Sequence, residues 1–497
     1  MGFIIMKETE DMKLNQTERK AFDRKLIRIA LPIAIQSLML AAVAAGDALM
    51  LGHVAQAEMT AVSLATQIQF VQNMFLSSAT GAGAILGAQY WGRKDRETVQ
   101  DLFHIILRFC GWISLLFFFA CELIPEALMH IFTHDGELIK IGSAYLRIAG
   151  WSYLITGISQ CYMAIMKVTD HVSPSSWISS SAVIINILLN AVFIFGMFGL
   201  PAMQARGAAL ATTIARVAEL VLCLIVAGGK SYIRPAWRRL FERRKALSRD
   251  FRKQVLPLLG GALFWGVGFT SYTAIIGHMG SDAAAANSVA AVIRDLICCV
   301  CNGIAGAAGI MVGNELGAGR LERGKAFGIR LKNMSWIIGF GSTGLILALT
   351  PLVTHMVSLS AEAAEYLTGM MIIMAVYMIG RCVNTVTING VLDGGGDTLF
   401  DMYSLAVCMW GIAIPLALLG AFVFGWPVLA VYACTCLDEV GKIPWVMARF
   451  RKYKWVQDLT RRREEIQSSD DPLEGECSCA EDTSSRTQET GAPSGTL

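Results

Sequence analysis

The sequence predicts an all-α integral membrane protein, with twelve transmembrane helices in two six-helix bundles that are related by an internal parallel repeat. Three observations support this fold class. Of the 497 residues, 54% are hydrophobic and only 16% are charged, whereas about a quarter of the residues in soluble globular chains are charged. Twelve segments are long and apolar enough to cross a bilayer as helices. Finally, the two halves of the chain align with each other.

The twelve spans follow from a search for apolar stretches of about 20 residues, the length that crosses the hydrocarbon core. The first stretch follows a basic N-terminus, as in a signal peptide, but it is too long and no small-residue cleavage site follows it. We therefore expect a retained helix. With boundaries at turn residues and charges, the spans are expected to start near residues 26, 59, 102, 136, 174, 204, 254, 283, 327, 361, 398 and 426.

Lys and Arg occur in alternate loops. They are frequent in the N-terminus, in residues 91–97, 229–254 and 318–332, and after 448, whereas loops such as "HVAQAEM" and "SLSAEAAE" have none. Because cytoplasmic loops carry an excess of Lys and Arg, the alternation predicts a multi-pass protein of the cell membrane with both termini cytoplasmic. Residues 229–254 hold ten Lys or Arg against two acids. We interpret them as a topogenic linker, and no nucleic-acid partner is expected.

The internal repeat relates the two halves. Residues 52–97 align without a gap on the residues 225 positions later, with 11 of 46 identical. Because each copy holds an even number of spans, the copies share one orientation, as in carriers whose site lies between two bundles. The expected domains are a cytoplasmic N-terminal segment, an N-terminal bundle, a basic linker, a C-terminal bundle and a largely disordered tail. Their bounds are 1–25, 26–228, 229–253, 254–448 and 449–497.

One acid, Asp47, lies within the first apolar run, in "VAAGDALMLGH". A carboxylate at the bilayer centre costs about 3 kcal/mol, and acids at this depth usually belong to functional sites. The repeat places Tyr272 at the equivalent position, and this asymmetry predicts that any ion site belongs to the N-terminal bundle. We interpret Asp47 as a proton or cation carrier. The alternative is that it lies near the external end of its span and is solvated there.

Two amides and one proline in the first half also stand out. Asn186 and Asn190 are four residues apart and therefore share one helical face. They either bind a cation and line a cavity, or form hydrogen bonds between helices. Pro32 removes a backbone donor. It either kinks the first span or occupies the first helical turn, where proline is harmless.

Arg294, Asp295 and Arg381 lie inside predicted spans of the second half. Adjacent helical residues point about 100° apart, so Arg294 and Asp295 are not expected to face each other. We hypothesise that Asp295 pairs with Arg381 as a polar lock or as the charged wall of a substrate cavity. The alternative is an ion pair that only sets helix register. The segment "LDGGGDT" lacks the Lys of a phosphate-binding loop, so we expect a tight turn there.

Six segments follow one another along the chain: "LPIAIQSLMLAAVAAGDALMLGHV", "GAQYWGRKDRE", "INILLNAVFIFG", "GAALAT", "GNELGAGRLERGKAFG" and "GVLDGGGDT". In this order they resemble the multidrug and toxic compound extrusion (MATE) family of transporters, and the resemblance covers about residues 22 to 450. It implies two bundles in a V around a central cavity. It also implies export of organic cations and amphipathic compounds by alternating access, against an inward flow of Na+ or H+.

The resemblance also implies a cation or proton site in the N-terminal bundle. The positions that match the family's site residues are Asp47, Asn186, Asn190 and Thr212. Many members have an Asp where this chain has Asn190, so one carboxylate stands in place of two. The glutamate that some members carry early in the seventh span is absent from "ALFWGVGF". The coupling ion is H+ or Na+, and neither a cofactor nor a metal other than a Na+ at this site is expected.

The expected function is therefore that of an antiporter and not of an enzyme, acting as a monomer on small-molecule substrates within membrane lipid. A lipid-linked oligosaccharide flippase of the same superfamily is the first alternative, and it should place several cationic residues around the cavity. A membrane-embedded enzyme is the second, but the sequence shows no convincing cluster of His, Asp or Glu at one membrane face.

Overall fold

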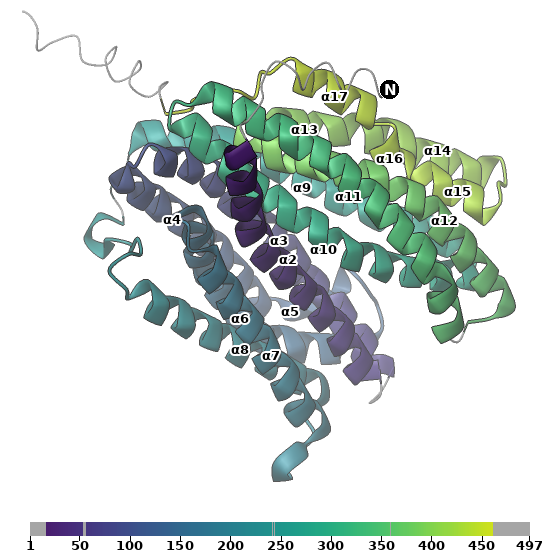
Figure 1. Ribbon diagram of the computed structural model, residues 1–497. Helices are drawn as coiled ribbons and strands as arrows, with labels where there is room; N and C mark the ends of the chain where they lie inside the picture. Colours follow the sequence, from purple (N-terminus) through teal and green to yellow (C-terminus); the bar gives the residue numbers. More distant parts are fainter. Residues whose placement is uncertain (1–15, 53–55, 241, 243, 358, 461–497) are drawn as a thin grey trace, which may run out of the picture. The chain divides into compact units, whose positions relative to one another are not determined.

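The computed structural model describes residues 16–52, 56–240, 242, 244–357 and 359–460, and these residues form helices without a strand. The described residues up to Leu459 belong to one compact unit (Figure 1). The helices of the first half are α2 (Gln16–Gly52), α3 (Gln56–Gly92), α4 (Arg96–Leu123), α5 (Pro125–His130), α6 (Gly136–Val168), α7 (Val172–Phe195), η1 (Met197–Gly199), α8 (Gln204–Ala227) and η2 (Trp237–Arg239).

The helices of the second half are more often interrupted. Three stretches have π-helical geometry, η3, η4 and η5, and the last segment is broken into three short helices. The elements are α9 (Lys245–His278), α10 (Ser281–Gly317), α11 (Leu321–Met356), α12 (Ala361–Asn384), η3 (Thr385–Leu392), α13 (Thr398–Leu405), η4 (Ala406–Ala413), α14 (Ile414–Leu418), η5 (Leu419–Val423), α15 (Val428–Thr435), α16 (Leu437–Val440) and α17 (Ile443–Arg451).

The observed helices match the twelve predicted spans, and each predicted start falls inside or beside a helical segment. Nine helices within the described residues are long and apolar enough to cross a membrane. The segments α3, α6 and α15 to α17 are not among these nine. Large apolar side chains remain exposed on the outer faces, including Trp112 at 71%, Trp177 at 74% and Ile337 at 72%. Exposed apolar surface of this extent is typical of a face that meets lipid.

The Lys- and Arg-rich segments meet at one end of the helices, which we call the basic end. Arg244, between the two halves, pairs with Glu97 at 3.5 Å. Arg330 of α11 forms a bidentate pair with Asp23 of α2, with a shortest distance of 2.7 Å. These contacts join basic segments that lie far apart in the sequence, as the alternation of loop charges predicts.

Close packing of α3 against α10 at the basic end follows the internal repeat. A Cβ on Gly92 would lie 2.1 Å from the backbone oxygen of Asn314, and a Cβ on Gly317 would lie 1.9 Å from that of Gln89. Gln89 and Asn314 are 225 residues apart, as are Gly92 and Gly317. The two contacts are therefore equivalent under the repeat, and each depends on a glycine that lets two helix backbones approach.

The two repeat-related prolines also take equivalent places. Pro32 lies inside α2, and Pro257 lies inside α9. The interpretation of Pro32 as a first-turn proline is therefore wrong, because α2 begins at Gln16. Each proline removes one backbone hydrogen bond from the middle of its helix.

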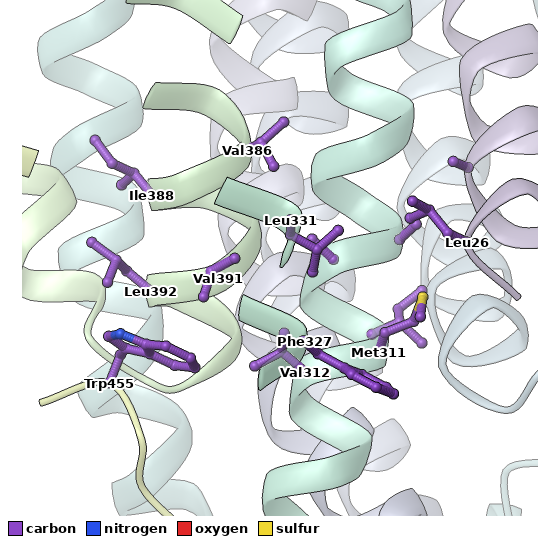
Figure 2. Close-up of a cluster of buried hydrophobic side chains, with 14 of the residues drawn as sticks. Leu26, Met311, Val312, Phe327, Leu331, Val386, Ile388, Val391, Leu392 and Trp455 are labelled. Carbon is purple, nitrogen blue, oxygen red and sulfur yellow. The ribbon is translucent and has the colours of Figure 1, made fainter. Parts of the chain in front are cut away.

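The apolar core at the basic end connects both halves. Figure 2 shows Leu26 of α2 near Met311 of α10 and Phe327 of α11, with Trp455 on the other side of the cluster. Trp455 is fully buried and lies beyond the last helix. The main chain of this residue approaches the "LDGGGDT" segment, where a Cβ on Gly395 would lie 1.9 Å from the Trp455 oxygen.

The "LDGGGDT" segment forms the tight turn that was predicted. Gly396 has a φ of +86°, which L-residues rarely adopt, and the Asp397 N–H donates to the Leu392 carbonyl at 3.0 Å. This turn ends η3 and starts α13.

Candidate functional site

A cavity of about 560 Å³ lies between helices of the two halves. One side is lined by α2, α3 and α6, and the other by α9, α10, α12, η3, α13 and α16. On the first side, α3 and α6 contribute Ser77, Ser78, Thr80 and Gln160 to the lining. Polar residues that line a cavity are consistent with the absence of α3 and α6 from the nine most apolar spans of the described chain.

Six charged side chains line the cavity, and five of them come from the second half. Lys167, in the last turn of α6, is the charged lining residue of the first half. The lining residues of the second half are Arg381, Asp393, Asp401, Glu439 and Lys442. Charged groups within membrane-spanning segments are costly unless they are paired or face water.

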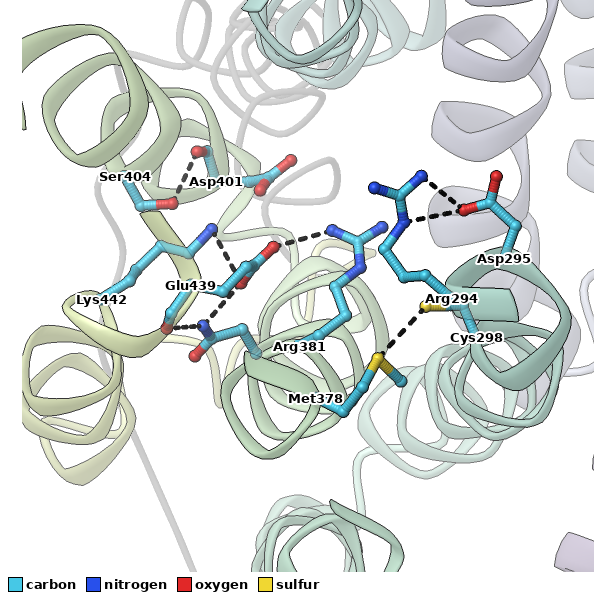
Figure 3. A network of polar contacts seen from close by, with 10 residues as sticks. Arg294, Asp295, Cys298, Met378, Arg381, Asp401, Ser404, Glu439 and Lys442 are labelled. Atoms are coloured by element: carbon cyan, nitrogen blue, oxygen red, sulfur yellow. Dashed lines mark hydrogen bonds and ion pairs between the residues drawn. The ribbon is translucent and has the colours of Figure 1, made fainter. Parts of the chain in front are cut away.

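Glu439 is the centre of a buried network (Figure 3). Its carboxylate accepts from Arg381 Nη1 at 2.7 Å and from Asn384 Nδ2 at 2.7 Å. Lys442 Nζ lies 3.4 Å from the second carboxylate oxygen. The side chains of Glu439 and Lys442 are each 4% exposed. These three partners compensate the negative charge of the buried carboxylate, and removal of one of them would lower the stability of the protein.

Breaks in the last segment put this network in place. The segment is interrupted at Cys436 between α15 and α16, and again before α17. The Glu439 backbone oxygen accepts from Asn384 Nδ2 at 2.7 Å, and Gly380 lets the two helices meet there. Interrupted helices are tolerated at membrane depth where they line a polar cavity and other groups satisfy the freed backbone.

Asp393 and Asp401 add two carboxylates to the same cavity. Asp393 is 5% exposed, and its Oδ1 atom is buried without a hydrogen-bond partner in the part of the chain that the structure describes. Asp401, on α13, lies beside Lys442 and Glu439 in Figure 3. The second half therefore contributes three acidic side chains to the cavity lining but only two cationic ones.

The predicted pairing of Asp295 with Arg381 is wrong. Asp295 pairs with its neighbour Arg294 at 2.9 Å, and Arg381 pairs with Glu439 (Figure 3). The arginine side chain is long enough to turn along the helix to the adjacent residue, and it also lies over the ring of Phe269 at 4.4 Å. The expectation that Arg294 and Asp295 do not face each other therefore fails as well.

The three residues nevertheless line one space. Arg294, Asp295 and Arg381 belong to the wall of a second cavity of about 270 Å³. Trp265 and Arg381 line both this cavity and the larger one. These charges therefore line a cavity without the predicted pair, and its role in substrate binding stays a prediction.

The structure brings three of the four predicted coupling residues together. Asn186 Nδ2 donates to Thr212 Oγ1 at 3.2 Å, and Asn190 Nδ2 donates to Asn186 Oδ1 at 3.3 Å. The first of these bonds joins α7 to α8, so the interhelical hydrogen bond is confirmed. Asp47 lies on α2, which packs against α7, but its side chain is outside the described residues. The role of these residues in ion binding stays a prediction.

Sequence reasoning missed the charges that dominate the larger cavity, namely Lys167, Glu439 and Lys442. They lie in "AIMKV" and "LDEVGK", within predicted spans. The criterion applied to Asp47, a charge inside an apolar run, would have found them. Among the described residues, no group of three or more His, Cys, Asp or Glu side chains is arranged to hold a metal ion.

Comparison with known proteins gives the family. The MatE family model matches residues 32–192 and 257–419. The uncharacterized transporter YisQ of Bacillus subtilis (strain 168) is 24% identical over 436 residues, which cover 87% of this chain and 95% of that protein. The probable multidrug resistance protein NorM of Thermotoga maritima is 23% identical over 455 residues, with coverages of 89% and 95%.

The solved structures show the same fold. The Vibrio cholerae MATE transporter VcmN in its bent form matches with a TM-score of 0.79 at 15% identity, over 88% of this chain and 98% of that one. The family model covers both repeat halves, and the cavity lies between them. This chain therefore belongs to the MatE family, the multidrug and toxic compound extrusion transporters of the membrane.

Proposed function

We propose that this protein is a secondary active multidrug exporter that couples inward movement of Na+ or H+ to efflux of amphipathic compounds by alternating access. The observation that carries this proposal is the cavity, which receives walls from both repeat-related halves. Relatives named as probable multidrug resistance proteins support the substrate class. In this proposal the basic end is cytoplasmic, and the protein acts as a monomer.

Ion movement supplies enough energy for this export. The sequence has no nucleotide-binding motif. One positive charge that moves inward through about 100 mV releases about 2.3 kcal/mol. That free energy supports an outward gradient of about fiftyfold for a neutral substrate, before any ion gradient is added.

The proposed coupling group is Asp47, assisted by the amides of Asn186 and Asn190 and by the Thr212 hydroxyl. The hydrogen-bonded chain from Thr212 to Asn190 supports this assignment, because it holds the amide oxygens in one place beside the helix of Asp47. With a single carboxylate, the site carries one proton, or one Na+ with oxygen ligands from its neighbours.

The proposal is tested by dye efflux from vesicles in which Na+ and pH gradients are imposed separately. Asp47→Asn is expected to abolish gradient-driven efflux without lowering the amount of protein in the membrane. Glu137→Gln, at an exposed acid in the first turn of α6, is the matched control and should transport normally. Normal gradient-driven efflux by Asp47→Asn would refute the coupling role.

The flippase alternative is less well supported by the cavity. Three cations line it, as a flippase requires, but three carboxylates accompany them. A polyanionic lipid pyrophosphate would be repelled by the acids near Asp393. We therefore place the exporter first.

A further inference from the structure

The segment that follows α17 connects the two halves at the basic end. Residues 452–459, which we call the strap, form turns and extended chain but no helix. The strap begins directly after Arg451 of the second half, and it ends at Leu459, which contacts α3 of the first half. It therefore has one end on each of the two halves that the internal repeat relates.

The start of the strap is fixed to the second half by Trp455. This side chain is fully buried, and its ring stacks on Phe450 of α17 with the ring centroids 5.4 Å apart. A Cβ on Gly328 of α11 would lie 2.4 Å from an atom of the same ring. Figure 2 shows the ring beside Leu392 of η3. Withdrawal of Trp455 from this site would expose a large apolar surface, so the strap stays with the second half.

The end of the strap contacts the first half. Leu459 is partly buried and packs against the apolar cluster that is formed mainly by α3, α4 and α6. Its backbone N–H donates to Gln89 Oε1 of α3 at 2.8 Å. Gln89 Nε2 in turn donates to the backbone oxygen of Gly394, in the glycine-rich turn of the second half, at 3.1 Å. One fully buried amide of the first half therefore holds two separate segments of the second half.

These contacts exist only while the halves meet at the basic end. Movement of α3 away from the second half breaks both hydrogen bonds of Gln89, and it withdraws Leu459 from the first-half cluster because Trp455 retains the strap. A buried amide that loses its partners and an apolar side chain that becomes exposed both raise the free energy of the open state. Three residues, 456–458, separate Trp455 from Leu459, so the released end stays close and can return.

We propose that the strap is a latch that favours the state in which the basic end is closed. Trp455 is its fixed end, and Leu459 is the end that releases from Gln89. This inference rests on the proposed function, because only a protein that alternates between two states releases and re-forms such a contact. In that function the latch sets how often the cytoplasmic side opens.

The latch is weak enough to open in each transport cycle. The net contribution of one hydrogen bond shifts an equilibrium about fivefold to tenfold. A contact of this strength changes the populations of two states without trapping the protein in one of them. The full burial of Trp455 and the partial burial of Leu459 therefore suit a fixed end and a releasing end.

The test measures the ratio of open to closed basic ends by electron–electron double resonance in lipid nanodiscs, without an ion gradient. Spin labels on non-natural amino acids at Lys94 and Glu322 report the distance between the halves. Leu459→Ala is expected to raise the ratio about fivefold. Truncation after Asp458 removes Leu459 with its N–H, and Gln89→Met removes both side-chain hydrogen bonds at similar length. Each of these two changes is expected to raise the ratio about tenfold.

Two matched controls isolate the releasing end. Truncation after Thr460 keeps the strap complete and should give the wild-type ratio. Val456→Ala shortens another partly buried apolar side chain of the strap, which packs against the cluster around Trp455, and it should also give the wild-type ratio. Thermal unfolding in detergent checks that every variant is folded.

The outcomes separate this inference from the proposed function. Wild-type ratios for both Leu459→Ala and the truncation after Asp458 would overturn the latch. An equal rise for Val456→Ala or for the truncation after Thr460 would also overturn it, because the effect would not depend on the releasing end. Raised ratios in a protein without gradient-driven efflux would refute the exporter and leave the control of opening established, whereas efflux with unchanged ratios would do the reverse.

Discussion

Replacement of Gly317 by alanine should open the basic end of the molecule. The new Cβ would lie 1.9 Å from the Gln89 backbone oxygen, whereas real Cβ contacts stay beyond about 3.0 Å. The helices α3 and α10 must therefore separate by at least about 1.1 Å, which is 3.0 minus 1.9. Because both partners in the contact are backbone, no side chain can rotate to relieve it. Overpacking of this kind costs about 1–3 kcal/mol.

In a transporter that alternates between two states, this cost falls on the state in which the basic end is closed. A penalty of 1–3 kcal/mol shifts the ratio of the two states by about 5- to 150-fold. Gly92→Ala makes the repeat-equivalent contact, with a Cβ 2.1 Å from the Asn314 oxygen, so it should have a similar effect. Gly341→Ala in α11 meets no atom within 4 Å and is the matched control.

The assay is the distance between spin labels carried by non-natural amino acids at Lys94 and Glu322, which lie just beyond α3 and near the start of α11. We expect Gly317→Ala and Gly92→Ala to move the distance distribution to longer values and to slow efflux about tenfold. Gly341→Ala should leave both unchanged. If both substitutions kept the wild-type distances and the wild-type efflux, the close packing of α3 on α10 would not be the closed gate that we infer.

Three further substitutions test other parts of the structure. Asn190→Asp introduces a second acid at the proposed coupling site and should increase the dependence of efflux on Na+ or H+. An unchanged ion dependence would contradict the assignment of this site. Arg381→Gln removes one of the cations that compensate the buried Glu439 carboxylate, and it should lower the free energy of unfolding by about 3–5 kcal/mol. Thermal unfolding in detergent measures this loss. The double variant Arg381→Gln with Glu439→Gln should recover part of it. Deletion of residues 461–497 should leave efflux intact. By contrast, Trp455→Ala changes a fully buried side chain and should destabilise the protein by about 3–5 kcal/mol. Equal stability of Trp455→Ala and wild type would contradict that core role.

The internal repeat was predictable from sequence and extends to atomic contacts. The shift of 225 residues relates Pro32 to Pro257, and both lie inside helices. The same shift relates the two glycine contacts between α3 and α10. The repeat remains detectable in the sequence at Gly92 and Gly317 because a larger residue would not fit between the closely packed helices.

The pairing of charges was not predictable in the same way. Sequence places Asp295 and Arg381 inside spans but does not give the rotation of each helix or which helix is its neighbour. Arg381 pairs with Glu439 on α16, a short helix of the broken last segment, where the Glu439 backbone oxygen also accepts from Asn384 of α12. The adjacent pair of Arg294 and Asp295 forms because a long flexible side chain can turn back along its own helix.

Taken by itself, the sequence determined the membrane class, the twelve spans, the shared end of the basic segments and the two related halves. These features depend on local composition and on periodicity along one chain, since lipid demands apolar length and topology follows loop charge. Only the tertiary structure decided that Lys167, from the first half, and Asp393, from the second, line one cavity. That juxtaposition depends on how helices from different halves rotate and pack, and no local pattern in the chain encodes it.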